Sequence, residues 1–172
     1  MHYLITGGTG FIGSALLSAW DAAGHRVTVL SREPRVATQR CRYIQDLGVI
    51  ASDEQFDAVV NLAGASLAGA RWNASYKQEI LTSRTATTHS LVDLLGRLEQ
   101  RPEVLLSASA IGYYGHQGDE PLGEDATPVP GFSQQLCQQW EHEAIRAEQF
   151  GVRVCRLRLG VVLDSRGGAM LD

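Results

Sequence analysis

The stretch Thr6-Gly7-Gly8-Thr9-Gly10-Phe11-Ile12-Gly13 decides the fold of this chain. It follows residues 2–6 (HYLIT), a short apolar run that ends in glycines and predicts a buried strand. It leads into residues 11–23, where apolar side chains recur at the spacing of one helix face. A glycine-rich turn between a buried strand and a helix is the context in which a phosphate-binding loop is expected.

Three glycines in this stretch, Gly7, Gly10 and Gly13, have the spacing of a dinucleotide-binding loop. The first permits a tight turn out of the strand, the second permits close approach of a pyrophosphate, and the third permits close packing of helix and sheet. Free N–H groups at the helix N-terminus then favour the phosphates. A glycine-rich turn without a ligand is the alternative. The cofactor-contacting residues expected here are Gly7, Thr9, Gly10, Phe11, Ile12 and Gly13.

Strand-like and helix-like segments alternate along the rest of the chain. Strand patterns cover residues 2–6, 26–30, 41–45, 56–62, 103–107 and 152–157, with a short further candidate at 161–163. Helical patterns cover residues 11–23, 73–98 and 132–150, whereas residues 33–40 are too short for a helix and residues 112–131 resemble a loop. This alternation predicts an α/β fold: a doubly wound parallel sheet of the Rossmann type, with helices on both faces.

Length and composition limit the class of protein. The 172 residues fit one domain, residues 1–172, and the 44% hydrophobic and 20% charged content is typical of a globular protein. A net charge of −4 gives no indication of nucleic-acid binding, and no apolar run approaches the roughly 20 residues that cross a bilayer. Because the strand pattern starts at once, we expect no signal peptide and a cytoplasmic protein. Three cysteines without a close pair predict neither disulfides nor a metal site.

The ends of two predicted strands add cofactor contacts. Ser31 and Arg32 follow the strand at 26–30, where an acidic residue would bind the adenosine ribose of NAD. Arg32 can instead pair with a 2′-phosphate and Ser31 can donate to it, which favours NADP over NAD; a solvated surface charge is the alternative for Arg32. The small residues Leu62, Ala63 and Gly64 follow the strand at 56–62 and allow backbone to lie against the cofactor.

Several short strings together resemble a known family. GGTGFIG at 7–13, NLAG at 61–64 and LLSASAIGYYG at 105–115 are similar to the extended short-chain dehydrogenase/reductases. Other strings resemble an atypical branch of the NAD-dependent epimerase/dehydratase type, the sugar-nucleotide-epimerase-like family, some of whose members are called cell-division inhibitors. Those strings are SREP at 31–34, RWN at 71–73, TSR at 82–84, LCQQWE at 136–141 and RLGVVLDSRGGAML at 158–171.

The resemblance implies an unusual active site. Short-chain dehydrogenases generally carry Tyr-x-x-x-Lys, whereas Phe132 and Leu136 stand at the corresponding positions here, so that acid/base pair is absent. Ser109 matches the active-site serine or threonine, with a strand-end serine satisfied by backbone as the alternative. The phenol of Tyr113 or Tyr114 could replace the missing tyrosine, with packing as the alternative. The tentative catalytic residues are Ser109 and Tyr113.

Three more cofactor contacts follow from the resemblance alone. The family pattern implies that Glu79 and Arg84 line the cofactor site and that Val162 packs near the nicotinamide. A surface ion pair between Glu79 and Arg84, worth little, is the alternative. Extended members also dimerise through two long helices, here residues 73–98 and 132–150, so a homodimer is expected by analogy.

Two functions remain open. The first is an NADP-dependent oxidoreductase or epimerase acting on an unknown small molecule, with a nucleotide sugar or a carbonyl compound as candidates. The second is a non-catalytic NADP-binding protein with a regulatory or redox-sensing role. Extended members continue well beyond this length, so the C-terminal substrate-binding part is expected to be absent from the chain.

Overall fold

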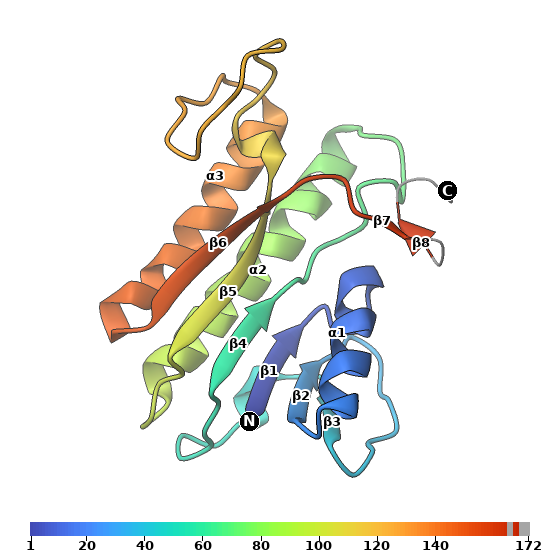
Figure 1. Ribbon diagram of the computed structural model, residues 1–172, viewed down its shortest axis with the longest axis vertical. Coiled ribbons are helices and arrows are strands. Elements are labelled where there is room, and N and C mark those ends of the chain that lie inside the picture. Colours follow the sequence, from blue (N-terminus) through green and yellow to red (C-terminus); the bar gives the residue numbers. More distant parts are fainter. Residues whose placement is uncertain (165–166, 169–172) are drawn as a thin grey trace.

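Six parallel strands form one sheet in the computed structural model, which describes residues 1–164 and 167–168 (Figure 1). The strands are β1 (His2–Thr6), β2 (Arg26–Leu30), β3 (Cys41–Ile44), β4 (Ala58–Asn61), β5 (Val104–Ala110) and β6 (Arg153–Leu159). Their spatial order is β3-β2-β1-β4-β5-β6. The order of a doubly wound Rossmann sheet is thereby confirmed, and it reverses between β1 and β4, where such sheets bind ligands.

Helices cover both faces of the sheet, as the alternation of patterns predicted (Figure 1). On one face lies α1 (Phe11–Ala22); on the other lie α2 (Ala74–Arg97) and α3 (Phe132–Ile145). Short 3₁₀ turns occur at Leu47–Val49, Ile111–Tyr113 and Arg146–Phe150. No helix in the described residues is long and apolar enough to span a bilayer.

Alternate residues of each buried strand supply two separate cores. Leu4 is fully buried and packs in the cluster that includes Leu91 and Leu95 of α2. Its neighbour Ile5 points to the opposite face and packs in the cluster with Leu16 and Trp20 of α1. Because a strand places successive side chains on opposite faces, Leu4 and Ile5 are both apolar, whereas Thr6 at the end of the strand is buried with its hydroxyl hydrogen-bonded. This double burial fixes the strand that precedes the glycine loop.

Some element boundaries differ from the sequence-based expectation. β5 extends to Ala110 because residues 107–110 pair with β6, including Ser109 opposite Arg158. The helix expected over 132–150 ends as a 3₁₀ turn that stops at Gly151, whose φ of +81° is left-handed. The short strand expected near 161–163 is β7 (Leu163–Asp164), which pairs with β8 (Gly167–Gly168) outside the main sheet. Residues 165–166 and 169–171 of the string RLGVVLDSRGGAML lie outside the described residues.

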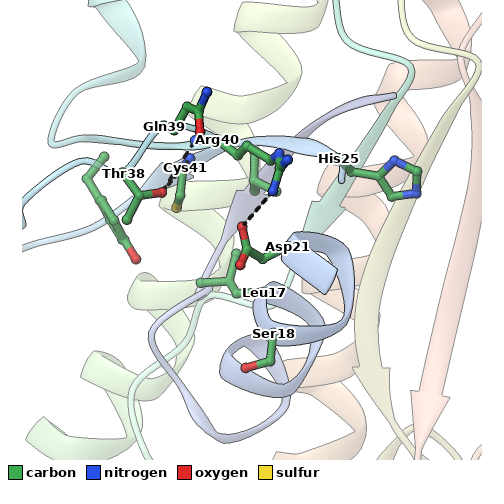
Figure 2. Close-up of a pocket in the computed structure, with 10 residues that line it drawn as sticks. Leu17, Ser18, Asp21, His25, Thr38, Gln39, Arg40 and Cys41 are labelled. Atoms are coloured by element: carbon green, nitrogen blue, oxygen red, sulfur yellow. Dashed lines mark hydrogen bonds and ion pairs between the residues drawn. The ribbon is translucent and has the colours of Figure 1, made fainter. Parts of the chain in front are cut away.

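The connection from β2 to β3 contains no helix, as its short polar sequence indicated. The amino halves of these strands are therefore covered by α1 and by the loop alone. A cavity of about 360 Å³ remains there, floored in part by Val27, Cys41 and Tyr43. Figure 2 shows Arg40 and Asp21 at its rim, 3.9 Å apart. The cavity lies at the opposite end of the strands from the glycine loop.

Candidate functional site

A crevice of about 450 Å³ lies at the carboxyl ends of β2, β1 and β4, at the reversal of strand order. It is bordered by the glycine loop, the end of β2, the turn after β4 and one side of α2. The sequence-predicted residues that line it are Gly7, Thr9, Gly10, Ser31, Arg32, Leu62, Ala63 and Gly64. Residues from four separate segments of the chain are thus brought together at one site.

The glycine loop has the geometry that its spacing predicts. Gly7 has a left-handed φ of +68°, and a Cβ there would lie 2.6 Å from the carbonyl of Leu62. A Cβ on Gly13 would lie 2.6 Å from the Cα of Gly8, so α1 can approach the loop only without a side chain. A Cβ on Gly10 meets only the Gly7 oxygen, at 3.3 Å. Gly7 and Gly13 are therefore required by the fold, whereas Gly10 keeps the crevice side of the loop clear.

The β2 end of the crevice carries a cation and a hydroxyl. The Ser31 side chain is nearly buried and its Oγ donates to the carbonyl of Glu33 at 2.8 Å. The backbone carbonyl of Arg32 accepts from Nε2 of Gln45 at 3.0 Å, and Arg32 itself is exposed and lines the crevice. Sequence reasoning missed Gln45, whose position directly after β3, the neighbour of β2, was the available signal. Because the Ser31 proton is donated to the Glu33 carbonyl, the expected hydrogen bond from Ser31 to a 2′-phosphate is not available in this arrangement.

Arg84 lies beneath the turn after β4 rather than in the open crevice. Its guanidinium donates to the carbonyls of Ile80 at 3.0 Å and Ala65 at 3.1 Å, and it stacks 5.2 Å from the Trp140 ring. A Cβ on Gly64 would lie 2.7 Å from the Arg84 guanidinium carbon. Burial lowers the pKa of Arg84. This side chain therefore supports the turn that borders the crevice.

Polar side chains of the sheet also hold the turn that follows β4. Thr6 Oγ1 donates to Asn61 Oδ1 at 2.6 Å and accepts from the N–H of Ala63 at 3.2 Å. The Asn61 amide donates in turn to Thr88 at 2.8 Å and Ser107 at 3.1 Å. Since these groups are buried and hydrogen-bonded, they fix the backbone where β4 ends.

Six of the expected cofactor contacts lie apart from the crevice lining: Gly13 and Arg84, described above, and Glu79, Phe11, Ile12 and Val162. Glu79 is exposed, and the described residues contain no ion pair between it and Arg84. Phe11, Ile12 and Val162 instead border a separate cavity of about 290 Å³ beside α1. Phe11 and Ile12 nevertheless begin α1, so their N–H groups belong to its free N-terminal turn. Contacts from these side chains to a cofactor remain predictions.

Ser109, the first candidate catalytic residue, is only 3% exposed, and its hydroxyl is bonded to a carboxylate. Its Oγ donates to Oε1 of Glu141 at 2.7 Å. Glu141 is 4% exposed and also accepts from Arg158, at 2.9 and 3.0 Å, and from Arg156, at 3.3 Å. Burial raises the pKa of Glu141, but the hydrogen bonds from Arg158 and Ser109 outweigh it, and the pKa lies below its ordinary value. Ser109 is thus satisfied by an ionised side chain rather than by backbone.

The two tyrosines after β5 contact the same arginine. The Arg158 guanidinium carbon lies 3.5 Å from the centre of the Tyr113 ring. Its Nη1 donates to the Tyr114 hydroxyl at 2.9 Å and to the carbonyl of Glu124 at 2.8 Å. The hydrogen bond from Arg158 to Glu141 is the main cause of a raised pKa for Arg158. The pair Glu141–Arg158 therefore engages both candidate catalytic residues.

Sequence reasoning quoted Glu141 and Arg158 within family strings but assigned them no role. The signal was present on α3, where Gln134, Cys137, Glu141 and Ala144 follow helical spacing on the buried face. A carboxylate at such a position requires a cation. At the two positions that the resemblance implies for the Tyr and Lys of the family motif, Phe132 packs against Trp72, with ring centres 5.5 Å apart, and Leu136 is buried.

Residues 3–166 match the model of the NAD dependent epimerase/dehydratase family. The chain belongs to this family. An epimerase family protein of Staphylococcus haemolyticus is 40% identical over 98% of the chain. The chain spans 58% of that relative's length, so the comparison covers only part of the relative.

Solved structures agree with this assignment. The human epimerase family protein SDR39U1 (isoform 2), solved with NADPH, is 33% identical, with a TM-score of 0.84 over 99% of this chain and 57% of the human chain. The UDP-glucuronic acid 4-epimerase of Bacillus cereus, solved with NAD, has a TM-score of 0.77 over 98% of this chain and 59% of its own, at 20% identity. The second likeness concerns the fold alone. The resemblance to an atypical short-chain dehydrogenase/reductase is confirmed.

Proposed function

We propose that this chain binds NADP(H) in the crevice and belongs to an atypical epimerase or oxidoreductase. The observation that carries the proposal is Arg32, an exposed residue that lines the crevice at the end of β2. In NAD-binding sites an acidic residue accepts hydrogen bonds from the ribose at this place. A guanidinium there matches a 2′-phosphate in charge and geometry. The human relative solved with NADPH supports the same choice.

The remaining crevice residues fit the rest of the dinucleotide. Gly10 leaves room for a pyrophosphate beside the loop, and the first turn of α1 begins at Phe11 with free N–H groups. The turn at residues 62–64 presents its backbone to the side of the crevice that lies toward β5. When bound, NADP supplies the hydride chemistry. The chain's own part is to hold the phosphates and the riboses in a fixed orientation across the strand ends.

The substrate is proposed to meet the cofactor near the ends of β5 and β6. Ser109, Tyr113 and Tyr114 all lie there, and a nucleotide sugar or a carbonyl compound remains the candidate substrate. Selection of that substrate is assigned to the part of the relatives that this chain does not span. A homodimer and a cytoplasmic location remain part of the proposal.

One observation favours a second function, a non-catalytic NADP-binding protein with a regulatory or redox-sensing role. The Ser109 proton is committed to Glu141, and the Tyr113 ring lies against Arg158. The Ser109 hydroxyl is therefore not free to donate its proton to a substrate unless its bond to Glu141 rearranges. Mixing NADPH with a panel of carbonyl compounds and following nicotinamide absorbance separates the two functions, because a sensor binds NADPH without consuming it.

Calorimetric titration with NADPH and NADH tests the cofactor assignment. The wild-type chain should bind NADPH more tightly, and Arg32→Ala should remove roughly tenfold or more of the NADPH affinity while leaving NADH unchanged. The matched control is Arg35→Ala, an exposed arginine of the same loop that does not line the crevice. Equal affinities for both nucleotides in the wild type would contradict the NADP assignment.

A further inference from the structure

The crevice described above accounts for only part of a dinucleotide's path. Its lining comes from the ends of β2, β1 and β4, together with α2. A dinucleotide that crosses the reversal of strand order extends its second half past β4 toward β5. The segment that follows β5, residues 111–131, therefore stands where the nicotinamide half arrives.

Several hydrogen bonds within this segment converge on one residue, Tyr114. The N–H of Val129 donates to the Tyr114 carbonyl at 2.9 Å, and the Gln117 side chain bridges the carbonyls of Tyr114 and Thr127 at 2.9 and 3.0 Å. Gly115 has a left-handed φ of +72°, and a Cβ there would contact the Val129 backbone. The loop thus has an internal structure whose anchor is Tyr114, directly after the 3₁₀ turn Ile111–Tyr113 that follows β5.

Arg158 connects that anchor to the rest of the domain. It comes from β6, and its side chain is 14% exposed. Its Nε and Nη2 hold the two carboxylate oxygens of Glu141 on α3, while Nη1 holds the Tyr114 hydroxyl and the Glu124 carbonyl. The Arg158 guanidinium therefore links β6 to α3, to Tyr114 and to the Glu124 carbonyl within the loop.

We propose that Arg158 is a positioning residue for the nicotinamide half of the cofactor: it holds Tyr114 and the loop 115–131 as a fixed wall beside the end of β5. The proposal rests on the proposed function, because it requires that a dinucleotide occupies the crevice. Arg158 does not act as an anion receptor, since its Nε, Nη1 and Nη2 already donate to Glu141, Tyr114 and the Glu124 carbonyl.

The chemistry of the guanidinium explains why an arginine is needed here. Its planar fork carries five N–H donors in fixed directions, so two can pair with a carboxylate while others reach the tyrosine and the loop carbonyl. A lysine at 158 keeps the charge and could still pair with Glu141. It cannot hold Glu141, Tyr114 and Glu124 together in this geometry.

A neighbouring residue provides a matched control. Arg156 also comes from β6 and also pairs with Glu141, at 3.3 Å. Its side chain is 43% exposed, and no contact between it and the loop 115–131 is found in the described residues. A comparison of the two arginines therefore separates support of Glu141 from positioning of the loop.

The test compares NADPH with 2′,5′-ADP, which carries the adenosine half and the 2′-phosphate but no nicotinamide. Dissociation constants of both probes are measured for the wild type, Arg158→Gln, Arg158→Lys and Arg156→Gln. Arg158→Gln should weaken NADPH binding by about tenfold or more and leave 2′,5′-ADP unchanged. Arg158→Lys should give a smaller loss, and Arg156→Gln none. Amide hydrogen exchange across residues 114–131 should rise in Arg158→Gln.

An unchanged affinity for 2′,5′-ADP also shows that a variant is folded. If Arg158 had a merely structural role, its replacement would weaken the binding of both probes. Equal losses for both probes, no loss of NADPH affinity, or the same loss in Arg156→Gln would each overturn the proposal. It would also fail if the wild type bound NADPH no more tightly than 2′,5′-ADP. If the wild type binds neither probe, that result contradicts the proposed function itself and not only the role of Arg158.

Discussion

The Ser109 hydroxyl donates to the Glu141 carboxylate over 2.7 Å, in a part of the domain where both residues are almost fully buried. The two residues are 32 positions apart, one at the end of β5 and the other on α3. Through this bond a residue that resembles a catalytic serine also joins the sheet to its covering helix. The first two predictions separate these roles.

Replacing Ser109 with alanine should destabilise the domain without weakening cofactor binding. The change removes a buried hydrogen bond to a charged group, which is worth about 2 kcal/mol of unfolding free energy. Urea denaturation measures that loss, and NADPH titration measures binding. The control Ser90→Ala, an exposed position within α2, should lose nothing because alanine is a good helix former. A Ser109→Ala variant of wild-type stability would show that the bond to Glu141 contributes little.

Replacing Glu141 with glutamine should have a larger effect than Ser109→Ala. The amide cannot neutralise Arg158 and Arg156, so a buried charge loses its partner at a cost of about 3 kcal/mol. The same denaturation measurement checks this value, with the exposed Glu120→Gln as control. If Glu141→Gln unfolds at the urea concentration of the wild type, the pair is not the structural link described here.

Two glycines of the loop should respond differently to alanine. Gly13→Ala places a Cβ against the backbone of Gly8 and should strongly destabilise the fold. Gly10→Ala meets only one oxygen at 3.3 Å and should leave the fold within about 1 kcal/mol of the wild type, while the methyl group blocks the pyrophosphate. Thermal unfolding and NADPH titration together check both outcomes. Gly160→Ala, with no atom near its Cβ, is the neutral control. Wild-type NADPH affinity in Gly10→Ala would place the phosphates elsewhere.

Acidification should weaken the domain through His2. Burial, and then the charge of Arg26, lower the pKa of His2 below its ordinary value of 6.5, and its ring contacts Thr28 and the Gln55 carbonyl at 3.0 Å each. The folded state therefore favours the neutral ring. Its contribution is fully present above pH 6.5 and is lost as the pH falls from there through the lower pKa of the folded state. The free energy of unfolding should therefore decline as the pH is lowered from 7.5 to 5.5.

The matched variant for this pH dependence is His2→Gln, which cannot titrate in that range. Its free energy of unfolding should depend less on pH between 7.5 and 5.5 than that of the wild type. Parallel curves for the two proteins would assign the pH dependence to other groups. The carboxylates Glu141 and Glu143, whose pKa values are lowered, should weaken the fold only as the pH falls below about 4.5.

Local patterns were sufficient to predict the fold and to predict that the glycine loop and the ends of two strands meet at one crevice. The strand before Gly7 is apolar at Leu4 and Ile5 because it is buried on both faces, and the glycines allow close backbone contacts of Gly7 with Leu62 and of Gly13 with Gly8. Arg32 and Leu62–Gly64 follow strands directly, so parallel strands bring them to one edge. Each of these features depends on residues close in sequence or on the regular geometry of a parallel sheet.

The partners of Ser109 could not be predicted in the same way. Its bond to Glu141 and the tie from Arg158 to Tyr114 join residues 32 and 44 positions apart. Nothing in the spacing of one segment specifies which charge it meets on another. Arg84 was similar: the sequence placed it in the cofactor site, whereas it lies in the buried series Ile80, Arg84 and Thr88 and donates to Ala65, in a turn whose position depends on tertiary packing.

The most direct test of the central claim is nuclear magnetic resonance of the isotope-labelled chain during titration with NADPH. The account predicts that the largest amide shifts fall at residues 7–13, at Arg32 and at residues 62–65, which surround the crevice. Shifts concentrated instead around Cys41 and Tyr43, at the cavity shown in Figure 2, would contradict it. The glycine loop would then be a structural turn, and the dinucleotide site would lie at the opposite end of the sheet.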